Sequence, residues 1–199
     1  GRVGRGHTEV LLGSVDAALE GAGVALVDID AVAVSEGPGR FSGLRVGLAT
    51  AKGLAAASGL PVIPVPTLAA LAESARPETG LVCPLLDARR GEVYAALFRL
   101  DRGRERLLED AALSPRKLAF MLAEVDGGEP ILFLGSGALE YREELQSALG
   151  ERAILDGRGI TAPLPAALAS LAEEAAPSAG PVGPLEPVYL RGIQNINPD

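Results

Sequence analysis

The sequence predicts an α/β protein that repeats one structural unit, and three observations support this. An apolar strand, a glycine-containing turn and a helix follow one another at residues 31–58 and again at 131–149. Hydrophobic residues make up 48% of the 199 residues, which is enough to build a core. The 25 glycines and 15 prolines are spread along the chain as boundaries between segments and follow no period.

The first part of the chain predicts alternating helices and strands. A helix is expected at 8–22, where apolar side chains recur at helical spacing. A buried strand at 30–35 precedes a second helix at about 42–58, which Gly59 and Pro61 end. The apolar stripe of the first helix consists of Leu11, Leu12, Val15, Ala18 and Leu19.

A proline marks the next strand as an edge strand. Residues 62–65 predict a strand, and Pro64 cannot donate a hydrogen bond to a ladder, so this strand is expected near the edge of its sheet. Thr67 is expected to cap a helix that runs to about Arg76.

The second part of the chain predicts a hairpin followed by further strands and helices. Strands at 81–86 and 92–100 are expected to pair, whereas the alternating charges from Arg102 to Asp110 indicate a solvated loop. No such hairpin precedes residue 31, and this asymmetry predicts that strands ahead of Gly1 are missing. The remaining predicted segments are a helix at 114–125, a strand at 131–134, a helix ending near 149, a short strand at 153–155 and a helix at 162–176.

Charge and cysteine content narrow the functional classes. The net charge of −8 opposes autonomous binding to a phosphate backbone. The single cysteine, Cys83, cannot form an internal disulfide and lies in an apolar run, so we expect a buried thiol and a reducing, cytoplasmic location. No apolar run approaches the ~20 residues that span a bilayer, so no membrane association is expected.

The turn at residues 35–45 has three interpretations. Its glycines lie between a strand and a helix, as in phosphate-binding loops, but their spacing matches neither a dinucleotide fingerprint nor a P-loop. Ser35 or Ser42 could be a nucleophile, but His7 is the only histidine available as a base. The third interpretation, a structural turn that begins a helix, is the one we favour.

The helix after this turn carries a ridge of small residues. Gly43, Gly47, Ala51 and Ala55 recur every four residues and lie along one side, next to Leu44 and Leu48. Each glycine costs about 0.5–1 kcal/mol relative to alanine, which close approach of another backbone can offset. The approaching element is either internal or a helix of another chain.

Two further candidate sites are less specific. His7 lies at a helix start without a second histidine or a cysteine pair, so no metal site is expected. Asp87 ends a strand, as in kinase-type phosphate sites, but Arg89 and Arg90 follow where such sites have small residues. A solvated turn is the simpler interpretation, and no catalytic residue or cofactor is expected.

Five segments stand out in order along nearly the whole chain: Gly6–Leu12, Gly37–Gly47, Ala49–Ala55, Leu86–Tyr94 and Glu186–Arg191. Together they resemble the TsaB (YeaZ) family. Arg40 and Ser42 depart mildly from the family pattern, which more usually has Ser and Thr at these positions.

The resemblance implies an α/β fold of the actin/Hsp70/sugar-kinase (ribonuclease H-like) type with two related halves. We expect an incomplete N-terminal half at 1–78, lacking its N-terminal hairpin, and a C-terminal half at 79–199 that starts with a hairpin. The family was historically grouped with glycoproteases of the peptidase M22 type. A peptidase or kinase-like ATPase of this fold is therefore the alternative function.

The resemblance also implies the leading function. It is a non-catalytic assembly subunit for N6-threonylcarbamoyladenosine modification of tRNA, at an adenosine in the anticodon loop. The subunit would pair with a TsaD-like catalytic subunit, help to recruit a TsaE-like ATPase and reach tRNA only through the complex. A homodimer is also possible. The expected interface residues are Thr8, Leu11, Leu12, Val15, Gly43, Leu44, Gly47, Leu48, Ala51 and Ala55.

Overall fold

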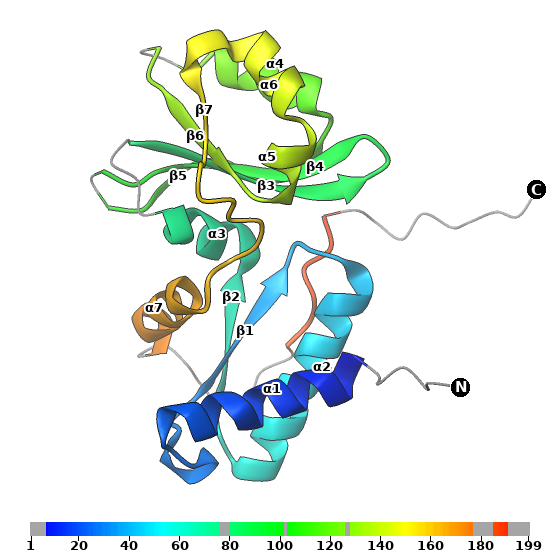
Figure 1. The fold of residues 1–199 in the computed structure, drawn as a ribbon, viewed down its shortest axis with the longest axis vertical. Helices are drawn as coiled ribbons and strands as arrows, with labels where there is room; N and C mark the ends of the chain where they lie inside the picture. The colour runs from blue at the N-terminus through cyan, green and yellow to red at the C-terminus, as the bar shows by residue number, and fades with distance from the viewer. Residues whose placement is uncertain (1–6, 76–79, 102, 126–127, 177–184, 191–199) are drawn as a thin grey trace, which may run out of the picture.

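The computed structural model describes residues 7–75, 80–101, 103–125, 128–176 and 185–190, and it contains two separate β-sheets (Figure 1). The helices are α1 (His7–Ala22), α2 (Phe41–Ser58), α3 (Thr67–Ala75), α4 (Pro115–Ala123), α5 (Ser136–Glu140), α6 (Arg142–Leu149) and α7 (Pro165–Ala175), with 3-10 turns η1 (Leu26–Asp28) and η2 (Gly150–Arg152). The strands are β1 (Val32–Gly37), β2 (Val62–Pro66), β3 (Leu81–Arg89), β4 (Glu92–Arg99), β5 (Glu105–Leu113), β6 (Ile131–Leu134) and β7 (Ala153–Leu155).

The first sheet consists of two parallel strands, β1 and β2, and α2 packs against it. β1 and β2 pair with Val32 opposite Val62. The helix ends where Gly59 takes a left-handed conformation (φ 74°) and its N–H donates to the Ala55 carbonyl at 2.8 Å, as the glycine predicted. Strand β2 is an edge strand, as Pro64 predicted.

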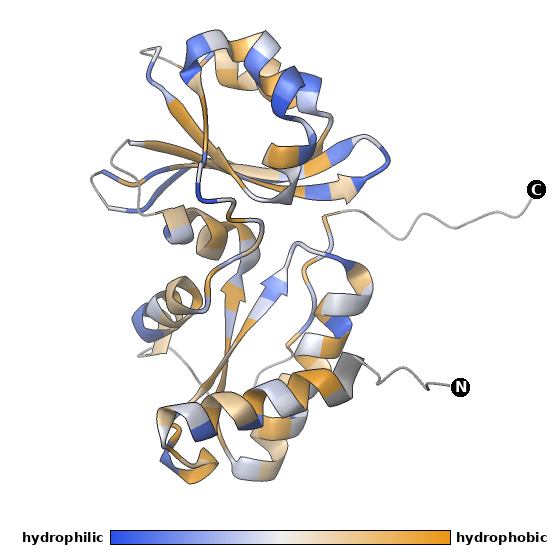
Figure 2. Ribbon diagram, in the orientation of Figure 1, coloured by the Kyte–Doolittle hydropathy of each residue, from blue (hydrophilic) through white to orange (hydrophobic). Residues whose placement is uncertain are grey.

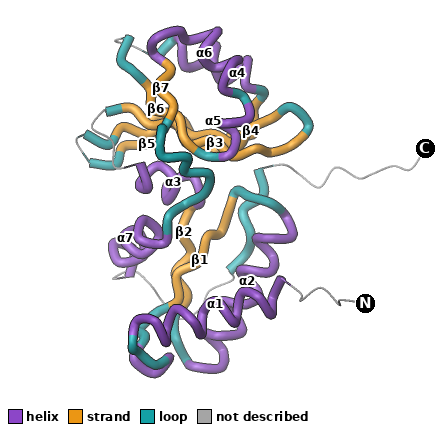
Figure 3. Tube along the Cα trace, viewed as in Figure 1, coloured by secondary structure: helices purple, strands orange, loops and turns teal. Residues whose placement is uncertain are grey.

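The second sheet has five strands in the order β5-β4-β3-β6-β7, drawn in orange in Figure 3. Helices α4, α5 and α6 cover one face of it, where Leu85, Phe133 and Leu145 are fully buried. The predicted hairpin is confirmed: β3 and β4 are antiparallel, and the turn between them places Arg89 and Arg90 at positive φ. The predicted repetition is also present, because β6 leads through Gly135 into α5 as β1 leads into α2.

A third core joins the two sheets. Helix α3 lies between them, packing on the face of the five-stranded sheet that α4–α6 leave open and on α7 (Figure 1). Val65, Leu71, Phe98 and Leu171 bring β2, α3, β4 and α7 together in this core. Helix α7 thus returns from the end of the chain to the first sheet, and the division at residue 78 stays an expectation.

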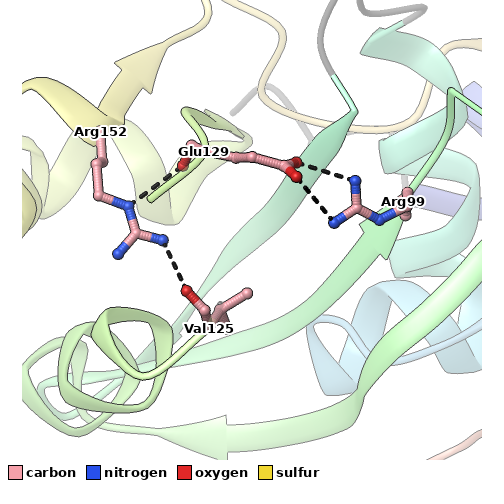
Figure 4. A network of polar contacts seen from close by, with 4 residues as sticks. All are labelled: Arg99, Val125, Glu129 and Arg152. Carbon is pink, nitrogen blue, oxygen red and sulfur yellow. Dashed lines mark hydrogen bonds and ion pairs between the residues drawn. The ribbon is translucent and has the colours of Figure 1, made fainter. Parts of the chain in front are cut away.

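Arg99 and Arg152 form a network of hydrogen bonds with Glu129 and Val125 at one end of the five-stranded sheet (Figure 4). Arg99 on β4 donates to the Glu129 carboxylate at 2.9 Å. Arg152 donates from Nε to the Glu129 carbonyl at 3.2 Å and from a terminal nitrogen to the Val125 carbonyl at 3.3 Å. These contacts join β4, η2 and the segment after α4.

Three details of the predicted elements are corrected. Part of the predicted solvated loop is an edge strand, β5, in which Arg106 and Asp110 point inward and form an ion pair, while Arg102 lies outside the described residues. The hydroxyl of Thr67 is buried without a hydrogen-bond partner among the described residues, so its predicted capping role is wrong. The helix predicted to end near residue 149 is broken at Tyr141 into α5 and α6.

Candidate partner-binding site

The turn between β1 and α2 contains a cluster of two aromatic rings and an arginine. Phe41 stacks on Tyr189 with ring centroids 5.3 Å apart. The Arg45 guanidinium lies 4.1 Å from the centre of the Phe41 ring, and its Nε donates to the Tyr189 hydroxyl at 3.2 Å. The described C-terminal segment, residues 185–190, is therefore fixed against the start of α2.

The same segment is fixed to β1 and to the core beneath α2. The Val188 N–H donates to the Glu36 carbonyl at 2.8 Å, and Leu185 is buried next to Leu48 and Ala55. The segment at 185–190 therefore supports α2, although it lies far from this helix in the sequence.

One side of α2 faces the chain's own sheet. Leu44, Leu48, Ala51 and Ala55 are each no more than 9% exposed. The last three pack with Val62, Leu185 and residues of β1. These four members of the expected interface therefore have an internal packing role.

The other side of α2 forms an apolar groove with α1. The groove encloses about 550 Å³. Among the described residues that line it, one is charged. It is lined by Leu12, Arg45, Val46, Ala49, Thr50, Gly53, Leu54 and Ala57. On α2 these residues recur at helical spacing, so the groove follows a continuous face of the helix.

The described residues leave this groove open beside Gly53. A Cβ atom built at Gly53 meets no described atom within 4 Å, and the same holds at Gly43 and Gly47, which lie on α2 outside the groove lining. Thr50 is only 9% exposed, and its buried hydroxyl has no hydrogen-bond partner among the described residues. The missing side chain at Gly53 is a cost that a partner in the groove can offset.

Helix α1 packs mainly on α2. Leu11, Val15 and Leu19 are half-buried, as predicted for one apolar stripe, whereas Leu12 is 40% exposed and lines the groove. Val10 is 54% exposed. The side chain of Thr8 lies outside the described residues. Figure 2 shows hydrophobic residues along both helices of this pair.

Asp87 at the hairpin turn forms hydrogen bonds and an ion pair with other residues of the chain. The Asp87 carboxylate accepts from the Arg89 backbone N–H at 2.8 Å and pairs with the Arg89 guanidinium at 3.3 Å. The Asp87 N–H donates to the Ser136 hydroxyl at 3.1 Å. This carboxylate therefore serves the local turn, in keeping with the simpler interpretation of the hairpin.

A second cavity of about 400 Å³ lies between β2, α7 and the start of β5. Its two arginines are engaged: Arg104 pairs with Glu73 at 3.7 Å and also with Glu174 on α7, and Arg106 pairs with Asp110. The pairs of Arg104 join the residue before β5 to α3 and α7, and together with the Arg106–Asp110 pair they leave no unpaired cation among the described residues of this cavity.

Two carboxylates interact between the two sheets. Partial burial, and then the charge of Asp110 on β5, raise the pKa of Glu36 on β1. Burial also raises the pKa of Asp110, although Arg106 opposes this. Each carboxylate therefore destabilises the fold when charged, and this cost disappears as the pH falls through the raised pKa values.

Comparison with known proteins identifies the family. A family model described as tRNA N6-adenosine threonylcarbamoyltransferase (TsaD) matches residues 2–179. The tRNA threonylcarbamoyladenosine biosynthesis protein TsaB of Bacillus subtilis is 32% identical over 188 residues, which are 94% of this chain and 80% of that protein. The chain belongs to the TsaB (YeaZ) family. TsaB of Escherichia coli is 42% identical over a shorter stretch, 49% of this chain and 43% of that protein.

Solved structures confirm the fold expected for the TsaB (YeaZ) family. YeaZ from Pseudomonas aeruginosa superposes with a TM-score of 0.77 at 32% identity, covering 94% of this chain and 85% of that one. A second structure from this organism, of a protein with similarity to peptidase YEAZ, gives a TM-score of 0.78. The fold is the actin/Hsp70/sugar-kinase type. No described helix is long and apolar enough to cross a membrane.

Proposed function

We propose that this chain is a non-catalytic assembly subunit for threonylcarbamoyladenosine modification of tRNA in the cytoplasm. It pairs through α1 and α2 with a TsaD-like catalytic subunit, helps to recruit a TsaE-like ATPase and reaches tRNA only through that complex. The names of its TsaB relatives support the pathway. The open groove between α1 and α2 is the observation that carries the pairing.

The groove supports a protein partner for physical reasons. Apolar surface that remains open on a folded chain gains about 25 cal/mol per Å² when a partner covers it. The helix pair offers such surface beside Gly53, where a second helix can approach closely. Within the expected interface, we assign partner contact to Leu12 and the outer side of α2, including Gly43 and Gly47, and internal support to Leu44, Leu48, Ala51 and Ala55.

Light scattering of the chain mixed with the TsaD-family catalytic subunit from the same organism tests the pairing. We expect a complex at micromolar concentrations whose mass is the sum of one copy of each protein. The chain alone has a mass of 20.3 kDa, so a homodimer is recognised at twice this value. If the two proteins keep their separate masses at these concentrations, the proposed pairing is wrong.

A further inference from the structure

The two helices of the groove carry opposite charges. Described α1 residues include Asp16 and Glu20 and no lysine or arginine, whereas α2 has Arg45 and Lys52 and no acidic residue. None of these four side chains forms an ion pair with another described residue. In a chain of net charge −8, α2 is therefore a basic surface next to an acidic one.

Arg45 is the charged residue that reaches the groove, and it is held in place. Its Nε donates to the Tyr189 hydroxyl, and its guanidinium rests on the Phe41 ring. A guanidinium has five N–H donors, and the structure shows a partner for only one of them among the described residues. The others remain available, and the fixed position lowers the entropy cost of using them.

Thr50 also lines the groove, but its hydroxyl oxygen is buried from solvent, which places it beyond the reach of a partner in the groove. Arg45 is therefore the polar group that an apolar partner helix meets here. Such a groove can distinguish partners, because a helix that offers no acceptor to the fixed cation loses affinity.

We propose that Arg45 is a specificity-determining residue that selects an acidic partner helix. This inference rests on the proposed function, and the occupant is a helix of the TsaD-family catalytic subunit. Its apolar face fills the groove, and one carboxylate accepts hydrogen bonds from Arg45. Tyr189 is a positioning residue, because it acts on the partner only through Arg45.

Titration of the catalytic subunit into the full chain at low and high salt tests this inference. For the wild type we expect affinity that falls as salt rises, because the pair is partly exposed. Arg45→Gln should bind roughly tenfold more weakly at low salt and lose most of the salt dependence. Tyr189→Phe should give a smaller loss. Arg40→Gln, an exposed arginine outside the groove lining, is the matched control and should bind like the wild type.

The outcomes separate this inference from the proposed function. If the wild type binds but Arg45→Gln binds equally well with the same salt dependence, the selection by Arg45 is wrong and the pairing stands. If the wild type itself does not bind, the pairing is wrong and the inference falls with it. An effect of Arg45→Gln only on tRNA binding or only on self-association would also overturn the inference. Melting temperatures of the variants check that each remains folded.

Discussion

Replacing Gly53 with leucine is expected to stabilise the isolated chain and to lower its affinity for the catalytic subunit at least about tenfold. Glycine inside a helix costs about 0.5–1 kcal/mol relative to better helix formers. A Cβ at this position meets no described atom within 4 Å, so the start of the new side chain has room. The new side chain would occupy the groove that the partner helix needs.

The two opposite effects make this variant informative. Urea unfolding measures the gain in stability, and titration with the catalytic subunit measures the loss of affinity. Ala148→Leu, at an exposed position of α6 on the five-stranded sheet, is the control and should pair normally. If Gly53→Leu pairs as tightly as the wild type, the groove is not the partner site.

Gly135→Ala is expected to destabilise the fold by about 3 kcal/mol or more, because two kinds of strain add. Gly135 has a φ of 104°, a backbone conformation that residues other than glycine rarely adopt. An added Cβ would also lie closer than 3.0 Å to the Leu85 carbonyl oxygen. It would also lie 2.9 Å from Leu71 in the core that joins the two sheets. Neither the β3 backbone nor the packed leucine can move without disturbing the core.

Thermal unfolding measures this effect. For a chain of this size we expect the Tm to fall by about 6–12 °C. Gly157→Ala is the matched control, because a Cβ there meets nothing within 4 Å and the residue has no positive φ in the left-handed range. A Tm unchanged by Gly135→Ala would show that the turn after β6 is looser than the structure indicates.

Most of the helices and strands could be predicted from periodicity and from glycine and proline boundaries. β5 was missed because it is an edge strand with charged residues on its inner face. Exposure alternates along Glu105–Asp110, but the inner positions include Arg106 and Asp110, whose ion pair depends on neighbours distant in the sequence. Inward-pointing charges protect edge strands, and they also hide the hydrophobic alternation that predicts a strand.

The helix pair of the candidate site could be predicted, but the side of α2 that faces outward could not. Spacing of four residues placed Gly47 and Ala51 on one ridge, yet only Ala51 is buried against the chain's own sheet. Which face lies inward depends on β1, β2 and Leu185, and Leu185 comes from the other end of the sequence.

Hydrogen–deuterium exchange of the chain, alone and saturated with the TsaD-family catalytic subunit, tests most directly whether α1 and α2 form the partner site. We expect slower exchange in His7–Ala22 and Phe41–Ser58 on binding, with little change in β3, β4 and α4–α6. Slower exchange confined to the five-stranded sheet, with α1 and α2 unchanged in a saturated complex, would contradict it.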